Sequence, residues 1–134
     1  MKPFVLEPGM LTMGGVFYPT GHMFLMFPSR DDAAKASQAL LDNGYSGESI
    51  SFVTPEQIRD NIARTIGDAD MQMPSAGTEA DTVRMYSQLA SQGHHALMVH
   101  APKAEQSEHV MDLLQSHPIS YAQKYRRLVI EDLA

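Results

Sequence analysis

The chain contains no cysteine and no tryptophan among its 134 residues. Without cysteine it forms neither a disulfide framework nor a thiolate zinc site, and it has no thiol nucleophile. Charged residues make up only 19% of the chain, and the formal net charge is −6. An acidic chain is poorly placed to neutralise phosphates, so neither nucleic acid nor an anionic membrane is an expected partner.

Long apolar runs are also absent. The uncharged stretch 9–28 is interrupted by glycine, proline, threonine and histidine, so it lacks the continuous run that a membrane span needs. Only Lys2 is basic near the N-terminus, and no long apolar segment follows it, so a signal peptide is not expected. We therefore expect a single domain over 1–134 that resides in the cytoplasm.

The chain does contain a regular succession of strand and helix signals. A continuous apolar run predicts a strand at 22–27, and further strands are expected at 50–53, 95–100 and, as a longer final strand, 121–130. Capping residues, prolines and closing glycines predict helices at 29–44, 54–67, 78–93 and 103–116. Residues 1–19 are expected to form an extended N-terminal segment.

The two halves of the chain resemble each other in register. A shift of 73 positions places His22 on His95 and Arg30 on Lys103, with strand, loop and helix in the same order. This repetition predicts two βαβ units, the first followed by a helical insertion at 55–93. The expected fold is α+β: a ferredoxin-like sandwich with a four-stranded antiparallel sheet and a two-helix insertion between its second and third strands.

Two resemblances to known families support this fold. The run from Phe24 to Ala34 and its continuation Leu40 to Tyr45 resemble the opening of the bacterial heat-induced general-stress-protein domain. The chain as a whole, with 96–102 and 125–133, resembles a small set of uncharacterised bacterial proteins. The resemblances imply a bacterial, stress-related setting and supply no catalytic residues.

The strand at 22–27 is apolar on both of its faces, with Met23, Leu25 and Phe27 on one and Phe24 and Met26 on the other. The sheet face opposite the helices must therefore be covered. The insertion with the N-terminal segment, a second subunit, or a small apolar ligand would each cover it. We favour a homodimer, with cover by the insertion as the next alternative.

Histidines and tyrosines at one end of the sheet are the candidate site residues. In an antiparallel sheet His22 and His100 approach each other, and with Tyr18 and Tyr125 they could line a ligand pocket. Two imidazoles are weak candidates for a metal site, because a third and a fourth donor are needed and no H-x-H or H-E-x-x-H spacing is present. No metal or other cofactor is therefore expected.

Two further groups of charged side chains have ordinary structural explanations. Glu105, His109 and Asp112 share one face of the last helix, where a solvated face is the more frequent arrangement. Asp68 and Asp70 form only a fragment of a calcium loop, without its central glycine and closing glutamate.

A basic segment close to the C-terminus alternates with an aromatic residue. Lys124, Arg126 and Arg127 surround Tyr125, a pattern that could suggest nucleic acid. Recognition of RNA on such a sheet needs stacking aromatics on the third strand, and residues 96–99 are Ala-Leu-Met-Val. A charged edge strand that resists further pairing is the expected role.

These observations together predict a non-enzymatic, dimeric bacterial domain with a stress-related, regulatory or ligand-sensing role and an unidentified small-molecule ligand. The alternative is a small enzyme or metal-binding protein, in which a histidine acts as a general base near neutral pH. That alternative uses His22 and His100, with Tyr18 or Tyr125 as a further candidate, and requires these side chains to converge on one concavity.

Overall fold

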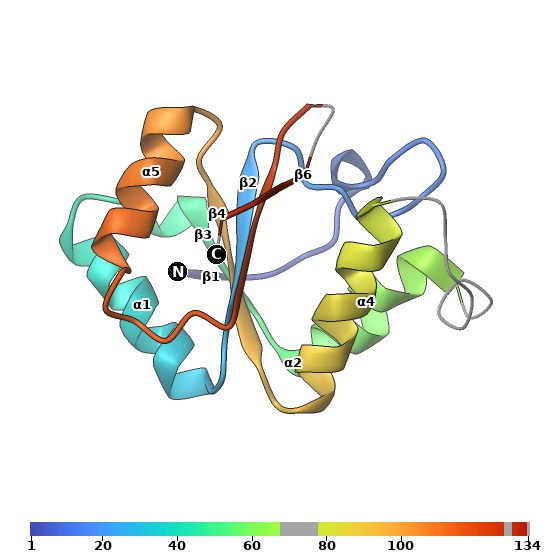
Figure 1. Ribbon diagram of the computed structural model, residues 1–134, viewed down its shortest axis with the longest axis horizontal. Helices are drawn as coiled ribbons and strands as arrows, with labels where there is room; N and C mark the ends of the chain where they lie inside the picture. The colour runs from blue at the N-terminus through green and yellow to red at the C-terminus, as the bar shows by residue number, and fades with distance from the viewer. Residues whose placement is uncertain (68–77, 128–129, 134) are drawn as a thin grey trace.

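The computed structural model of the protein describes residues 1–67, 78–127 and 130–133 (Figure 1). Its strands are β1 (Lys2–Pro3), β2 (His22–Phe27), β3 (Ile50–Val53), β4 (His95–His100), β5 (Tyr121–Tyr125) and β6 (Ile130–Asp132). Its α-helices are α1 (Arg30–Asp42), α2 (Pro55–Gln57), α4 (Thr78–Ser91) and α5 (Ala104–Leu113). Short 3-10 turns at Pro8–Met10 and Gly47–Ser49 complete the regular structure outside the insertion.

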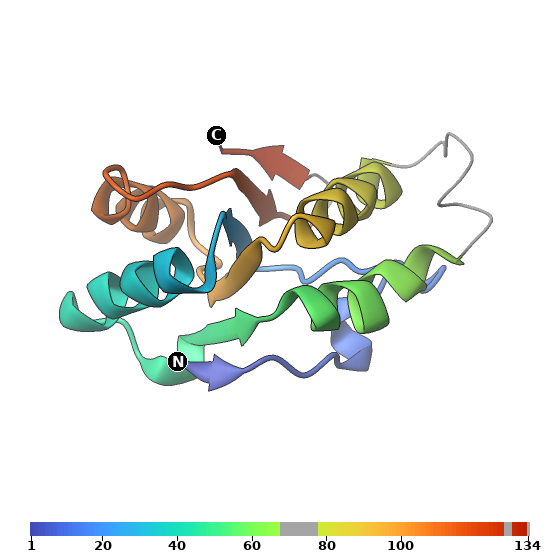
Figure 2. The same cartoon turned by 90° about the horizontal axis from the view of Figure 1, so that it is seen from below.

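The described strands form one mixed sheet in the order β1-β3-β4-β2-β5-β6. The pairings from β3 through to β6 are antiparallel, and β1 joins β3 in parallel. Figure 2 shows β1 and β6 at opposite edges of this sheet. The α+β class predicted from the sequence is confirmed. The predicted four-stranded sheet is wrong, because both ends of the chain add a short edge strand that carries little strand signal.

Helices cover both faces of the sheet. Figure 1 shows α1 and α5 on one side and α2 and α4 on the other. The alternation along β2 feeds two separate cores: Met23 and Leu25 pack with the α1–α5 layer, and Phe24 and Met26 pack with the insertion. A ferredoxin-like sandwich has its helices on one face only, so the predicted architecture is corrected here too.

Local signals place the first helix accurately. The side chain of Ser29 accepts a hydrogen bond from the Asp32 amide at 3.1 Å, which satisfies one of the free N–H groups at the start of α1. Ala33, Ala36 and Leu40 are fully buried beneath the sheet. Small residues at the first two positions let the helix lie close to the strands. The helix ends before Gly44, whose φ of +94° is readily adopted only by glycine.

The insertion covers the second sheet face within the same chain. One buried cluster on this face combines side chains of the sheet, the insertion and the N-terminal segment. Its members include Phe24 and Met26 of β2, Ile58, Ile62 and Ile66 of the insertion, Val83 and Tyr86 of α4, and Phe4 and Phe17 of the N-terminal segment. The intramolecular alternative therefore accounts for the doubly apolar strand, and that strand no longer argues for a second subunit. The homodimer stays a prediction.

The predicted helix over 54–67 is not a regular α-helix. Thr54 and Gln57 form the expected capping box, but a π turn (Ile58–Ile62) and a 3-10 turn (Ala63–Ile66) follow the single turn α2. These changes of pitch alter the angular spacing of the isoleucines, which are nevertheless all buried. Packing against the sheet has therefore overridden the helical period that the sequence suggests.

The predicted final strand over 121–130 is also wrong. The chain forms β5, reverses direction, and returns as β6, with Gln123 opposite Asp132 and Tyr125 opposite Ile130. As a result β5 lies between β2 and β6 and is not the edge strand that the basic residues suggested.

The described part of the chain contains no helix long and apolar enough to span a membrane. Asp68 and Asp70, the fragment of a calcium loop, lie outside the described residues.

Candidate functional site

His22 and His100 face each other at one end of the sheet. They are directly opposed in the β2–β4 register, and their ring centroids are 4.9 Å apart. His22 Nδ1 lies 3.1 Å from the Thr20 carbonyl, to which it can only donate. Burial lowers the pKa of His22, and the nearby His100 and Lys2 lower it further, whereas the carbonyl contacts oppose this shift. The neutral form of His22 is thus favoured.

The histidine pair lines a small cavity beneath the N-terminal segment. This cavity of about 220 Å³ is also lined by Glu7, Glu48 and Ser51. Within residues 1–67, 78–127 and 130–133, however, no three His, Cys, Asp or Glu side chains are grouped so that they could hold a metal ion. Two imidazoles alone leave a transition metal without a defined coordination geometry.

The two candidate tyrosines lie elsewhere. Tyr125 is fully buried, with its hydroxyl 2.8 Å from that of Tyr86. Tyr18 packs edge-on against the Tyr125 ring, and its hydroxyl donates to the Arg126 carbonyl at 2.6 Å. Tyr18 lines a separate surface hollow beside Thr20. The structure thus brings the four residues together as two separate pairs and not around one cavity.

The charged face of the last helix divides in a similar way. His109 stacks on Tyr45 and lies 3.0 Å from the Tyr45 hydroxyl. Glu105 is exposed, and Asp112 lines a different cavity. The three side chains therefore form no common ion site.

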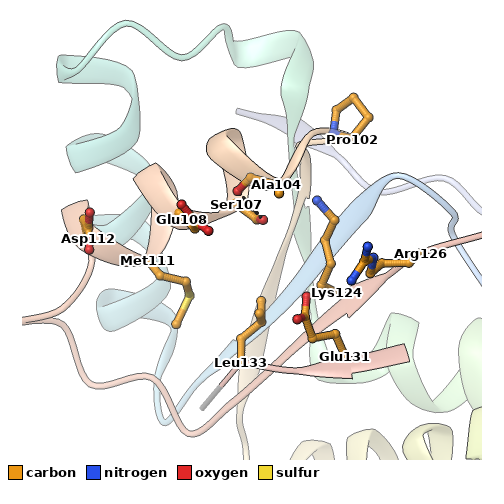
Figure 3. Close-up of a pocket in the computed structure, with 10 residues that line it drawn as sticks. All are labelled: Pro102, Ala104, Ser107, Glu108, Met111, Asp112, Lys124, Arg126, Glu131 and Leu133. Carbon is orange, nitrogen blue, oxygen red and sulfur yellow. Dashed lines mark hydrogen bonds between the residues drawn. The ribbon is translucent and has the colours of Figure 1, made fainter. Parts of the chain in front are cut away.

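A cavity of about 530 Å³ lies between α5 and the β5–β6 hairpin (Figure 3). Its volume is within the range of small-molecule sites in proteins, about 300–1,000 Å³. Its lining combines polar, charged and apolar side chains. The lining residues are Pro102, Ala104, Ser107, Glu108, Met111, Asp112, Lys124, Arg126, Glu131 and Leu133.

Lys124 is the most unusual residue of this cavity. Lys124 is only 3% exposed, and its ammonium donates a hydrogen bond to the Ala101 carbonyl. In the described part of the chain no carboxylate lies within ion-pair distance of it. Burial lowers the pKa of Lys124, and Arg126 contributes in the same direction, whereas Glu131 opposes the shift. A buried cation without an ion pair is costly, so its presence in a cavity wall calls for an explanation.

Short backbone contacts hold the cationic side of the cavity in place. The Gly21 amide donates to the Tyr125 carbonyl at 2.8 Å, and the Gly21 carbonyl accepts from the Ala101 amide at 3.0 Å. Gly21 has a φ of +81°, which a side chain would strain. Tyr18 fixes the next carbonyl, that of Arg126. The loop before β2 therefore positions both Lys124 and its acceptor.

The arrangement favours a negatively charged group beside Lys124 and Arg126. Pro102 and Ala104 place the first turn of α5 in the same wall, and the N-terminus of a helix carries a partial positive charge. Figure 3 shows Lys124 and Arg126 coming from the β5 side and Met111 and Leu133 lying between them and the outer part of α5. A small molecule with an anionic end and an apolar body matches these two parts of the lining.

Sequence reasoning missed this cavity, although one signal for it was present. Lys124 has the same strand parity as Ala122, which is fully buried against the α1–α5 layer. A lysine at an inward-facing position marks either an edge strand or a buried charge. Distinguishing them required knowledge of β6, which covers the outer side of β5.

Replacement of Lys124 by methionine tests the cost of burying this charge. At neutral pH we expect Lys124→Met to be as stable as the wild type or more stable, by up to about 1 kcal/mol. The lowered pKa means that the folded protein releases this proton before the unfolded chain does, at about pH 10.4. Wild-type stability therefore rises relative to that of the variant as the pH increases through the window below that value. Urea denaturation of both proteins at neutral and alkaline pH measures the difference, and a constant difference would contradict this account.

Comparisons with known proteins identify no family for this chain. The resemblances to the heat-induced general-stress-protein domain and to the small bacterial set accordingly stay predictions. No protein-family model matches the chain, and no curated protein or solved structure shows significant similarity to it.

Proposed function

We propose that the protein is a non-enzymatic binding domain for a small organic monocarboxylate, held in the cavity between α5 and the β5–β6 hairpin. The observation that carries this proposal is Lys124, a buried ammonium in the cavity wall with no carboxylate partner among the described residues. A ligand carboxylate would supply the missing opposite charge. The role corresponds to the ligand-sensing function expected from the sequence.

A single negative charge suits the cavity better than two. Three carboxylates, Glu108, Asp112 and Glu131, line it together with the cations Lys124 and Arg126. A phosphate dianion would meet stronger repulsion from these carboxylates than a carboxylate would. The apolar side chains of Met111 and Leu133 favour a ligand whose carboxylate is attached to a hydrocarbon part.

A binding role is favoured over catalysis by the state of the hydroxyl group in the cavity. The Ser107 hydroxyl donates to the Ala104 carbonyl at 3.0 Å within α5. No histidine is among the residues that line this cavity. In the described part of the chain, no hydrogen bond joins the Ser107 hydroxyl to a basic side chain that could activate it. The described residues therefore offer a recognition surface and not an activated nucleophile.

Calorimetric titration with caproate, a six-carbon monocarboxylate, tests the proposal. We expect saturable binding that weakens with added salt, because the main attraction is electrostatic. Lys124→Met should weaken binding by about tenfold to a hundredfold, the usual worth of a hydrogen bond to a charged group.

Lys35→Met is the matched control, since Lys35 is an exposed lysine on α1 outside the cavity lining. This variant makes the same change in net charge and should bind caproate like the wild type. If caproate does not bind, or if both variants bind as the wild type does, the proposal is wrong.

A further inference from the structure

The cavity beside Lys124 has an acidic side as well as a cationic one. Glu108 and Asp112 lie one turn apart on α5 and both line the cavity. Figure 3 shows them on the helix, with Met111 and Leu133 between Asp112 and the side chains of β5. Both acids are exposed, and in the described part of the chain neither forms an ion pair. Like charges at this spacing on a helix repel each other.

The charges of the whole lining favour a ligand that carries a cation too. Two cations and three carboxylates line the cavity, so a bare carboxylate enters a site that is already negative. One of those acids, Glu131, lies directly opposite Lys124 in the β5–β6 register and belongs to the cationic side. Glu108 and Asp112 remain on the other side without a counter-charge from the described residues.

The buried lysine is an independent sign of a ligand at the same cavity. An ammonium has three N–H donors. The Ala101 carbonyl is the one acceptor that Lys124 reaches in residues 1–67, 78–127 and 130–133. Two donors of a residue that is 3% exposed are therefore left for a bound group. Glu108 and Asp112 favour a positive charge at the other end of that bound molecule.

We propose that the ligand is a zwitterion with a short apolar stem, such as an ω-amino acid. Its carboxylate lies at Lys124 and Arg126, its stem lies over Met111 and Leu133, and its ammonium lies at Glu108 and Asp112. This inference rests on the carboxylate site proposed above and adds the class of ligand.

Titration with three probes of equal chain length tests the inference: caproate, ε-aminocaproate and hexylamine. We expect ε-aminocaproate to bind about 1.5-fold to fivefold more tightly than caproate, the usual range for an added ion pair at an exposed site. Hexylamine lacks the carboxylate and leaves Lys124 without an opposite charge, so it should bind more weakly than ε-aminocaproate.

Substitutions in α5 assign the difference to its acidic residues. Glu108→Gln combined with Asp112→Asn should remove the advantage of ε-aminocaproate over caproate. Glu105→Gln is the matched control, because Glu105 is exposed on the same helix but does not line the cavity. It should leave the affinity ratio unchanged. Circular dichroism checks that each variant is folded, which is expected because the three residues are exposed.

The outcomes separate this inference from the proposed function. If caproate binds in a Lys124-dependent manner but ε-aminocaproate binds no more tightly, the zwitterion is wrong and the carboxylate site stands. An advantage of ε-aminocaproate that persists in the Glu108 and Asp112 variant also overturns the inference. If neither caproate nor ε-aminocaproate binds, both proposals fail.

Discussion

Replacing Phe24 with alanine is expected to lower the free energy of unfolding by about 3–5 kcal/mol. Phe24 is fully buried in the central strand β2, on the face that the insertion covers. Its ring centroid lies 5.7 Å from that of Phe17 and 4.2 Å from that of Tyr86. The substitution therefore opens a cavity where the N-terminal segment and α4 both meet the sheet. Domains are typically stable by only about 5–15 kcal/mol, so the loss is a large part of the total.

The matched variant is Leu25→Ala, one residue further along the same strand. Leu25 is equally buried but packs against the α1–α5 layer. We expect a loss of about 2–5 kcal/mol for this variant. Two losses of this size would show that both faces of β2 are cores of the same chain. Urea denaturation followed by circular dichroism measures both.

Protein concentration supplies a further control. The side chains that cover Phe24 belong to the same chain, so the difference between wild type and Phe24→Ala should not depend on concentration. A difference that grows with concentration would mean that a second subunit covers this face. A loss below about 1 kcal/mol would mean that the insertion forms no real core there.

The sequence predicted elements whose limits are encoded locally. The apolar run 22–27 lies between Gly21 and Pro28, and Ser29 caps the helix that follows, so β2 and α1 agree with prediction. The opposition of His22 and His100 also followed from an antiparallel arrangement of their strands. In each case residues close in sequence, or one strand pairing, were sufficient.

Features that depend on distant contacts were not predicted. Residues 121–130 have no glycine or proline to mark the reversal between β5 and β6, so they look like one strand. The burial of Lys124 and the cavity beside it both depend on that reversal, because β6 and Leu133 form one of its walls. Likewise, Tyr18 and Tyr125 pair with each other and not with the histidines, because Tyr125 points toward the insertion core.

The buried tyrosine pair is expected to make the protein unfold steeply at alkaline pH. The Tyr86 and Tyr125 hydroxyls are 2.8 Å apart and both rings are fully buried. Burial raises the pKa of both residues, and repulsion from the Tyr121 phenolate, once that residue ionises, adds to the effect. Above about pH 10 the unfolded chain ionises these tyrosines while the folded chain keeps them neutral. Stability therefore falls with rising pH, by about 1.4 kcal/mol per pH unit for each tyrosine.

Phenylalanine substitutions separate this titration from the packing of the rings. Either Tyr86→Phe or Tyr125→Phe should cost about 1–3 kcal/mol at neutral pH, since each leaves the other hydroxyl buried without its partner. The double variant should lose less free energy of unfolding than the sum of the two single losses, because no hydroxyl is then left unpaired. For each pH unit above about 10, the free energy of unfolding of the double variant should also fall by about 3 kcal/mol less than that of the wild type.

Tyr45→Phe is the control. Burial raises the pKa of Tyr45 as well, but Tyr45 is only half-buried, so this substitution should reduce the loss of stability at alkaline pH much less. Urea midpoints measured from neutral to strongly alkaline pH test these expectations. An alkaline limb equally steep in wild type and double variant would show that other groups drive the unfolding, and additive losses would show that the two hydroxyls do not act as a pair.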